Sequence, residues 1–329
     1  MELKLKVMAA TVVAMVTFAV AADEPWFGAP IPASGEKPGV ADCGMSAAKV
    51  FDAPIEGLKR IGTLAVPEKE VSYGSDPQQT GDLFLPAKVT PETPFVLNIH
   101  GGGWSAMSRK DAAGVSAFLV EMGCAVYSID YRLASKETPW PACGDDCLKA
   151  AEFILRGGLA AHGLKPSRIW IAGVSAGGHL ALWTGLNLRS DQVAGIISVS
   201  GIADPIPDAK AHPQRYARLF GGREPNAADF DSMSIMKLVR RNCPRILLTH
   251  AMEDSVVPIE SAANFCKACR DVGNDDMAFF RYSAKDEPNL GGHVIWRSNY
   301  PVRKRLLRCI ETEIAHFMGI SQEVRKGEK

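Results

Sequence analysis

The sequence predicts an α/β fold, in which a mostly parallel sheet is covered by helices on both faces. Apolar runs of strand length alternate along the chain with stretches of helical periodicity. These runs are almost continuously apolar, which is typical of strands whose two faces are both buried. The chain has 329 residues without internal repeats or low-complexity segments, which is enough for one large domain with a sizeable core.

Each expected element follows from its local pattern. Eight segments have the length and apolar content of strands: 63–66, 82–85, 95–99, 125–129, 169–172, 194–199, 246–249 and 277–282. Five of the intervals have helical patterns: 111–122, 145–162, 176–188, 259–272 and 302–318. The predicted sheet is therefore eight-stranded.

The N-terminal segment has the organisation of a secretory signal. Lys4 and Lys6 precede an apolar run at 7–22 that contains the small residues Ala19-Val20-Ala21, which predicts a signal peptide at 1–21. The run is shorter than the ~18 apolar residues of a spanning helix, so we expect cleavage and no membrane span. We therefore expect the protein to be periplasmic or secreted.

Two further regions complete the expected organisation. Residues 22–60 are rich in proline, glycine and alanine and are expected to form an extended arm before the main domain at 61–329. Within that domain, the polar, proline-containing interval 202–242 breaks the alternation of strands and helices. It is either a cap over a pocket or a surface insertion without function.

A serine lies in a glycine-flanked turn between a predicted strand and a predicted helix. The segment Gly173-Val174-Ser175-Ala176-Gly177 follows the strand at 169–172 and leads into the helix at 176–188. Glycines at both ends leave the turn free of Cβ clashes, so Ser175 can be held in a strained conformation with its hydroxyl above the sheet. A plain glycine turn is the alternative. The strand-turn-helix setting favours a nucleophile.

Three consecutive glycines follow another buried strand. The strand at 95–99 runs directly into His100-Gly101-Gly102-Gly103-Trp104. Backbone N–H groups can stabilise a tetrahedral oxyanion only if no side chain blocks their approach, and glycines leave that approach open. The alternative is a flexible glycine loop, but the strand in front of it favours an oxyanion loop.

An acid and a base for Ser175 are expected further along the chain. The loop after the strand at 246–249 offers Glu253 and Asp254, and His293 lies in a glycine-flanked loop after the last predicted strand. The chain order serine, acid, histidine is that of α/β-hydrolases. Both acids remain candidates on this pattern alone.

The other six histidines are expected to have other roles. Three adjoin the expected site and are expected to be structural: His100, His179 and His250. Three are expected to be solvent-exposed: His162, His212 and His316.

With these motifs the chain resembles the hormone-sensitive-lipase-like esterases of the α/β-hydrolase fold. More narrowly, HGGGW at 100–104 and GVSAGGHLA at 173–181 resemble secreted carbohydrate or feruloyl esterase-like (BD-FAE-like) proteins. The resemblance covers roughly 61–319, and its further matches are 82–86, 130–132 and 254–258.

The resemblance implies a role for each residue of the site. It makes Ser175 the nucleophile, Asp254 the acid in preference to Glu253, and His293 the base. It also implies that three backbone N–H groups bind the oxyanion: those of Gly102, Gly103 and Ala176. Trp104, beside these glycines, is expected either to bind an acyl group or sugar ring of the substrate or to belong to the core.

The implied activity is hydrolysis of carboxylic esters, short acyl or carbohydrate-linked, through an acyl-enzyme. A serine peptidase of the prolyl-oligopeptidase type is an alternative. A catalytically inactive hydrolase fold used for binding is another, although the chain retains all three triad members.

Composition bears on partners and cofactors. The 37 basic and 37 acidic residues balance, which excludes the electrostatic footprint of a nucleic-acid-binding protein and suits a neutral ester substrate. No cofactor and no metal is predicted, since cysteines and histidines lack the spacing of a zinc site. Oligomeric state is not indicated.

The eight cysteines permit disulfides in an exported protein, although the pairing cannot be deduced. Cys143 and Cys147 are spaced to close a small loop at a helix start. Cys266 and Cys269 fall on one predicted helical face with Ala262 and Phe265, which favours packing or a structural disulfide over redox chemistry.

Overall fold

A computed structural model describes residues 67–274, 276–283, 292–293 and 304–320. The predicted signal peptide (1–21), the predicted arm (22–60) and the predicted strand at 63–66 lie outside the described residues.

The described residues form an eight-stranded sheet whose order is β1-β2-β4-β3-β5-β6-β7-β8. The strands are β1 Lys69–Ser72, β2 Thr80–Phe84, β3 Phe95–Ile99, β4 Ala125–Ile129, β5 Ile169–Val174, β6 Val193–Val199, β7 Ile246–Ala251 and β8 Met277–Tyr282. β1 and β2 pair antiparallel to each other, and β2 also pairs antiparallel to β4. The other neighbouring strands are parallel, as the apolar runs predicted.

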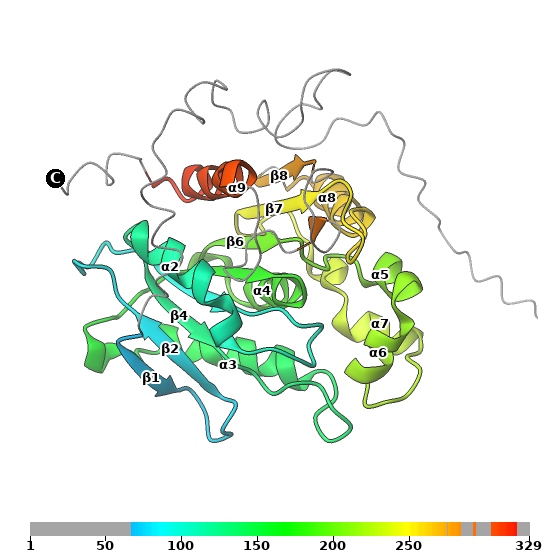
Figure 1. Ribbon diagram of the computed structural model, residues 1–329, viewed down its shortest axis with the longest axis horizontal. Coiled ribbons are helices and arrows are strands. Elements are labelled where there is room, and N and C mark those ends of the chain that lie inside the picture. The colour runs from blue at the N-terminus through cyan, green and yellow to red at the C-terminus, as the bar shows by residue number, and fades with distance from the viewer. Residues whose placement is uncertain (1–66, 275, 284–291, 294–303, 321–329) are drawn as a thin grey trace, which may run out of the picture.

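Helices cover both faces of the sheet (Figure 1). The longer ones are α2 Ala113–Glu121, α3 Ala142–Leu155, α4 Ala176–Asn187, α8 Glu260–Asp271 and α9 Lys304–Phe317. Side chains of α3, α4 and α8 share one hydrophobic cluster, and side chains of α2 and α9 share the other. The strands supply both clusters by alternation, because successive strand side chains point to opposite faces.

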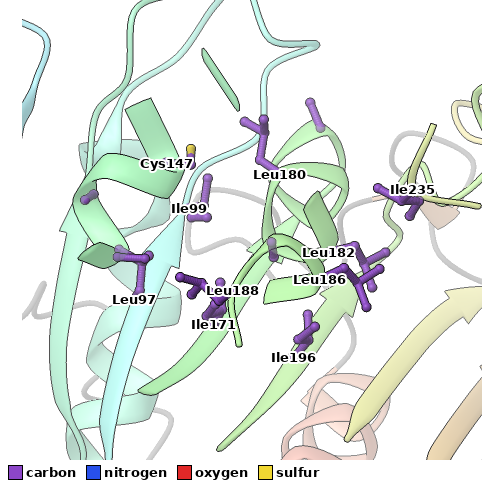
Figure 2. Packing of buried hydrophobic residues seen from close by; sticks show 14 of the residues in the cluster. Leu97, Ile99, Cys147, Ile171, Leu180, Leu182, Leu186, Leu188, Ile196 and Ile235 are labelled. Carbon is purple, nitrogen blue, oxygen red and sulfur yellow. The ribbon is translucent and has the colours of Figure 1, made fainter. Parts of the chain in front are cut away.

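Strand β3 illustrates the alternation. Leu97 and Ile99 belong to the cluster beneath α3 and α4, whereas Val96 belongs to the opposite cluster. Figure 2 shows Leu97 and Ile99 in the first cluster, together with Ile171 of β5 and Leu180 of α4. The sheet is therefore held between two apolar layers.

Strand β1 was not among the predicted strands. Three of its four side chains are exposed, so its sequence KEVS lacks the apolar pattern on which the prediction relied. Exposed charged side chains are common on edge strands, where they oppose pairing with another chain.

The prediction that Cys143 and Cys147 close a small loop at a helix start is wrong. Both residues lie inside helix α3, where they are buried and reduced. The prediction placed the helix start at 145, but α3 begins at Ala142. Cys266 and Cys269 are buried on α8 with Ala262 and Phe265, which confirms the packing interpretation.

The interval 202–242 folds onto the main domain. It forms three short helices: α5 Pro205–Ala211, α6 Pro213–Leu219 and α7 Ala227–Met233. Two of its prolines, Pro205 and Pro213, occupy the first turn of α5 and α6, where a missing N–H costs nothing. Figure 1 shows the three helices gathered at one side of the molecule, beneath α8.

Candidate active site

Ser175 lies in a sharp turn between β5 and α4. Its φ of 57° and ψ of −124° lie in a region that residues with a Cβ rarely adopt. A Cβ at Gly173 would lie 2.1 Å from the carbonyl oxygen of Gly177, and one at Gly177 would lie 2.3 Å from that of Ile99. The predicted turn is therefore confirmed, and both flanking glycines are required by close backbone contacts.

The structure brings Ser175, His293 and Asp254 into one hydrogen-bonded chain. The Nε2 atom of His293 is 3.0 Å from Oγ of Ser175, and its Nδ1 atom is 2.7 Å from Oδ2 of Asp254. Because an ionised carboxylate can only accept, the Nδ1–H of His293 donates to Asp254. The neutral ring then presents Nε2 as an acceptor for the serine hydroxyl, an arrangement that can take a proton from Ser175.

Asp254 is held as a buried anion. Its Oδ1 accepts hydrogen bonds from the backbone N–H groups of Val256 and Val257, each at 2.9 Å. Burial by itself raises the pKa of Asp254, but hydrogen bonds from His250 and His293 outweigh it and hold this pKa well below its usual value.

His250 supports the acid from strand β7. Its Nε2 donates to the carbonyl oxygen of Val257 at 2.9 Å and lies 3.3 Å from Oδ2 of Asp254. The ring is buried, so the expected structural role is confirmed: His250 ties the acid loop to the strand that precedes it.

Glu253, the competing acid, faces elsewhere. Its Oε1 accepts a hydrogen bond of 2.8 Å from the hydroxyl of Ser283, just after β8. The carboxylate that contacts His293 belongs to Asp254.

His293 is almost completely buried. Burial lowers its pKa, while the hydrogen bond and charge of Asp254 partly offset that effect. Charge interactions with His250 and, to a smaller extent, with Arg215 lower the pKa of His293 further. The imidazole is therefore neutral at pH 7 and available as a proton acceptor.

The glycine loop adopts the conformation for which glycines are needed. Gly102 and Gly103 have φ values of 107° and 58°, and a Cβ at Gly102 would lie 2.1 Å from the carbonyl oxygen of Ala106. At Gly101, a Cβ would lie 3.3 Å from Cβ of Ser175, so the loop passes beside the serine. Ala176 begins α4, where its backbone N–H has no partner within the helix.

His100 holds this loop, as predicted. Its Nδ1–H donates to the carbonyl oxygen of Gly101 at 2.7 Å, and its ring stacks on Tyr131 with a centroid separation of 4.3 Å. The Tyr131 hydroxyl donates to the carbonyl oxygens of His100 and Gly101 at 3.1 and 3.3 Å. Tyr131 was matched to the family motif at 130–132, but no structural role was predicted for it.

An ionic cluster lies behind the loop, with three of its members mostly buried and Glu70 exposed. Arg109 forms ion pairs with Asp82 at 2.9 Å and also with Asp130 and Glu70. These carboxylates come from β1, β2 and the end of β4, so the cluster joins the antiparallel edge of the sheet to the loop region. No charge pattern in the sequence indicates it, because its four members are far apart in the chain.

Trp104 is a core residue, and a substrate-binding role does not fit its burial. Its side chain has 0% exposure. The indole N–H donates to Nδ1 of His179 at 3.3 Å, and the ring lies 5.5 Å from those of His179 and Tyr216. Of the two roles expected for Trp104, the structure agrees with packing in the core.

His179 is buried in the same group. Its Nε2–H donates to the carbonyl oxygen of Met233 at 2.9 Å, and burial lowers its pKa to about 4. Of the histidines expected at the surface, His316 is exposed, whereas His162 and His212 are half-buried.

Replacing Trp104 by phenylalanine tests this assignment. We expect the free energy of unfolding to fall by about 1–3 kcal/mol, because Nδ1 of His179 loses its donor in a buried setting. Urea denaturation and KM for a soluble ester are the measurements. Unchanged stability with a raised KM would instead assign Trp104 to substrate binding.

Arg215 was not predicted, yet it lies at the glycine loop. It comes from α6, and its Cγ, Cδ and Nε atoms are 3.7, 3.8 and 3.9 Å from the position a Cβ would take on Gly103. The interval 202–242 therefore reaches the site, as a cap would. In the sequence, the polar composition of this interval was the only indication that it could contribute to the site.

The described part of the chain contains no group of three or more His, Cys, Asp or Glu side chains placed to hold a metal ion. No helix in the same residues has the length and apolar character needed to cross a membrane.

The strand order, the serine turn and the acid loop after β7 define the α/β-hydrolase class. Comparison with known proteins narrows the class, because the BD-FAE family model matches residues 81–268. The chain belongs to the BD-FAE family.

Individual proteins are similar to the chain over much of its length. Esterase LipC of Mycobacterium tuberculosis is 28% identical over 236 residues, which are 65% of this chain and 58% of LipC. The chain therefore spans little more than half the length of that relative. Kynurenine formamidase of Danio rerio is 25% identical over 279 residues, or 81% of this chain and 91% of the relative.

Among solved structures, a truncated form of a carbohydrate esterase from gut microbiota superposes with a TM-score of 0.64 at 22% identity. The match covers 78% of this chain and 98% of that one. This likeness confirms the fold.

Proposed function

We propose that the protein is a carboxylic ester hydrolase that works through an acyl-enzyme on Ser175. The observation that carries the proposal is the hydrogen-bonded chain from Ser175 through His293 to the buried Asp254, beside a loop in which Gly102 and Gly103 have positive φ. The esterase among its relatives supports the same reaction class.

In the acylation step, Oγ of Ser175 attacks the ester carbonyl carbon while Nε2 of His293 takes its proton. The carbonyl oxygen becomes an oxyanion, which accepts hydrogen bonds from the backbone N–H groups of Gly102, Gly103 and Ala176. Asp254 keeps the ring in the tautomer with Nδ1 protonated and stabilises the imidazolium. His293 then gives its proton to the departing alcohol oxygen, and the acyl group stays on Ser175.

In the deacylation step, His293 takes a proton from water, whose oxygen attacks the acyl carbon. The second tetrahedral intermediate collapses, Ser175 recovers its proton from His293, and the carboxylic acid leaves. A peptidase or formamidase would use the same steps with a nitrogen leaving group.

The pH dependence of kcat/KM follows from the lowered pKa of His293. Neutral His293 is required, so activity is lost as the pH falls through that pKa. We therefore expect the acid limb of the profile to have its midpoint below 6.5, the ordinary histidine value. A midpoint well above 6.5 would contradict a buried, neutral base, provided that circular dichroism shows a folded protein across the range.

For the substrate, we propose short acyl or carbohydrate-linked esters, supported by the BD-FAE family match and the carbohydrate-esterase fold likeness. A series of p-nitrophenyl esters from acetyl to palmitoyl, with acetylated xylan and a feruloyl ester, tests it. The highest kcat/KM is expected for short acyl chains. A maximum at ten carbons or more would indicate a lipase.

An amide panel tests the competing reaction classes. Hydrolysis of peptide amides without any ester cleavage would favour the peptidase. An aryl formamide belongs in the panel because of the formamidase relative. If the protein cleaves none of these compounds, the result would favour a catalytically inactive hydrolase fold used for binding.

We also propose export to the periplasm or medium, with removal of residues 1–21. The expected result is a mature chain that starts near Ala22, measured by intact mass on material from those fractions. A full-length chain in the cytoplasm would reject export.

A further inference from the structure

We propose that Arg215 binds a carboxylate on the substrate, so that the enzyme prefers esters that carry a second, ionised carboxyl group. The inference deepens the proposed ester hydrolysis and rests on it. It concerns specificity, and the carboxylate can belong to the acyl part or to the alcohol part of the ester.

The first argument is position. The side chain of Arg215 lies against Gly103 in the glycine loop, with Nε 3.9 Å from the position of a Cβ there. Its positive charge also makes a small contribution to the lowered pKa of the His293 ring. The side chain therefore lies beside the glycine loop that is expected to bind the oxyanion.

The second argument is that the guanidinium group is fixed in place. Nη1 of Arg215 donates to both carboxylate oxygens of Asp208, at 2.6 and 2.8 Å. Asp208 is completely buried and also accepts a hydrogen bond of 2.9 Å from the hydroxyl of Tyr216, itself buried. A pre-positioned arginine loses little side-chain entropy when it binds a ligand.

The third argument is the remaining hydrogen-bonding capacity. Among the described residues, both hydrogen bonds of the Arg215 side chain use Nη1, and the side chain is 15% exposed. The N–H groups of Nε and Nη2 form the second edge of the planar fork, whose geometry matches a carboxylate. A partly desolvated site strengthens such a pair relative to bulk water.

Matched pairs of small esters test the proposal in two arms. The acyl arm compares monomethyl glutarate with its neutral carboxamide, methyl glutaramate. The alcohol arm compares 4-acetoxybutanoate with 4-acetoxybutanamide. Ester cleavage is followed by proton NMR for the wild type, Arg215→Gln, Arg215→Lys and, as control, Arg218→Gln, which alters an exposed arginine on the same helix.

In at least one arm, the wild type is expected to favour the anionic ester over its neutral partner by about tenfold or more in kcat/KM, the effect of one charge-assisted hydrogen bond. Arg215→Gln should lower this ratio at least about fivefold. Arg215→Lys, which keeps a charge opposite Asp208 without the fork, should retain part of it, and Arg218→Gln should not change it. Thermal unfolding confirms that each variant is folded.

Two results would overturn the proposal: a wild type without preference in either arm, or a ratio that Arg215→Gln leaves unchanged. The second would leave Arg215 as a residue that only anchors α6. Failure of ester hydrolysis itself is distinguishable, because the wild type would then cleave neither the neutral partners nor p-nitrophenyl acetate.

Discussion

Replacement of Ser175 by alanine is expected to lower kcat by about 10⁴-fold or more, because only oxyanion and binding effects remain once the nucleophile is lost. The protein should stay folded. Alanine has the same Cβ as serine and faces the same backbone strain at φ 57°. Steady-state kinetics with a p-nitrophenyl ester and a thermal unfolding curve measure the two effects.

Ser175→Gly is a matched variant for the strain. It should be equally inactive, because it also lacks the hydroxyl. Glycine adopts this backbone conformation without a Cβ clash, so the free energy of unfolding should be about 1 kcal/mol higher than that of Ser175→Ala. Full esterase activity in either variant would eliminate Ser175 as the nucleophile.

The second large effect is expected for Asp254→Asn, which should lower kcat by about 10⁴-fold. The amide can still accept the backbone hydrogen bonds of Val256 and Val257 through its oxygen, so the loop is preserved. It cannot stabilise an imidazolium, and it favours the wrong tautomer of His293.

The neighbouring variant Glu253→Gln is the control. Glu253 contacts Ser283 rather than His293, so its loss should change kcat by less than about tenfold. The opposite ranking of the two variants would make Glu253 the acid. Both are measured under the same conditions, at a pH on the plateau of the profile.

Much of the fold could be predicted because its determinants are local. A buried parallel strand is apolar along its whole length, and β3 to β8 were all recognised on that basis. β1 was missed because an exposed edge strand carries polar side chains. The error at Cys143 and Cys147 has a similar origin, because the start of a helix is weakly marked when its N-cap residue, Pro141, makes no side-chain hydrogen bond.

The serine turn and the glycine loop could be predicted for the same reason. Each is a short segment whose backbone requires glycine at particular positions, and that requirement is visible in the chain itself. The order of serine, acid and histidine follows from the order of the strands that carry them.

The folded structure distinguishes residues whose local sequence patterns are similar. Glu253 and Asp254 are adjacent, and the path of the loop after β7 determines which one reaches His293. Trp104 follows the oxyanion glycines in the chain, but His179 and Tyr216 enclose it.

Arg215, more than 100 residues from the glycine loop, reaches it only because α6 packs there. The strands and helices, the serine turn and the class of chemistry could be predicted from the sequence, since they depend on the backbone preferences of neighbouring residues. The surroundings of each side chain depend on residues distant in the chain, and for that reason the acid, the packing role of Trp104 and the position of Arg215 required the folded structure.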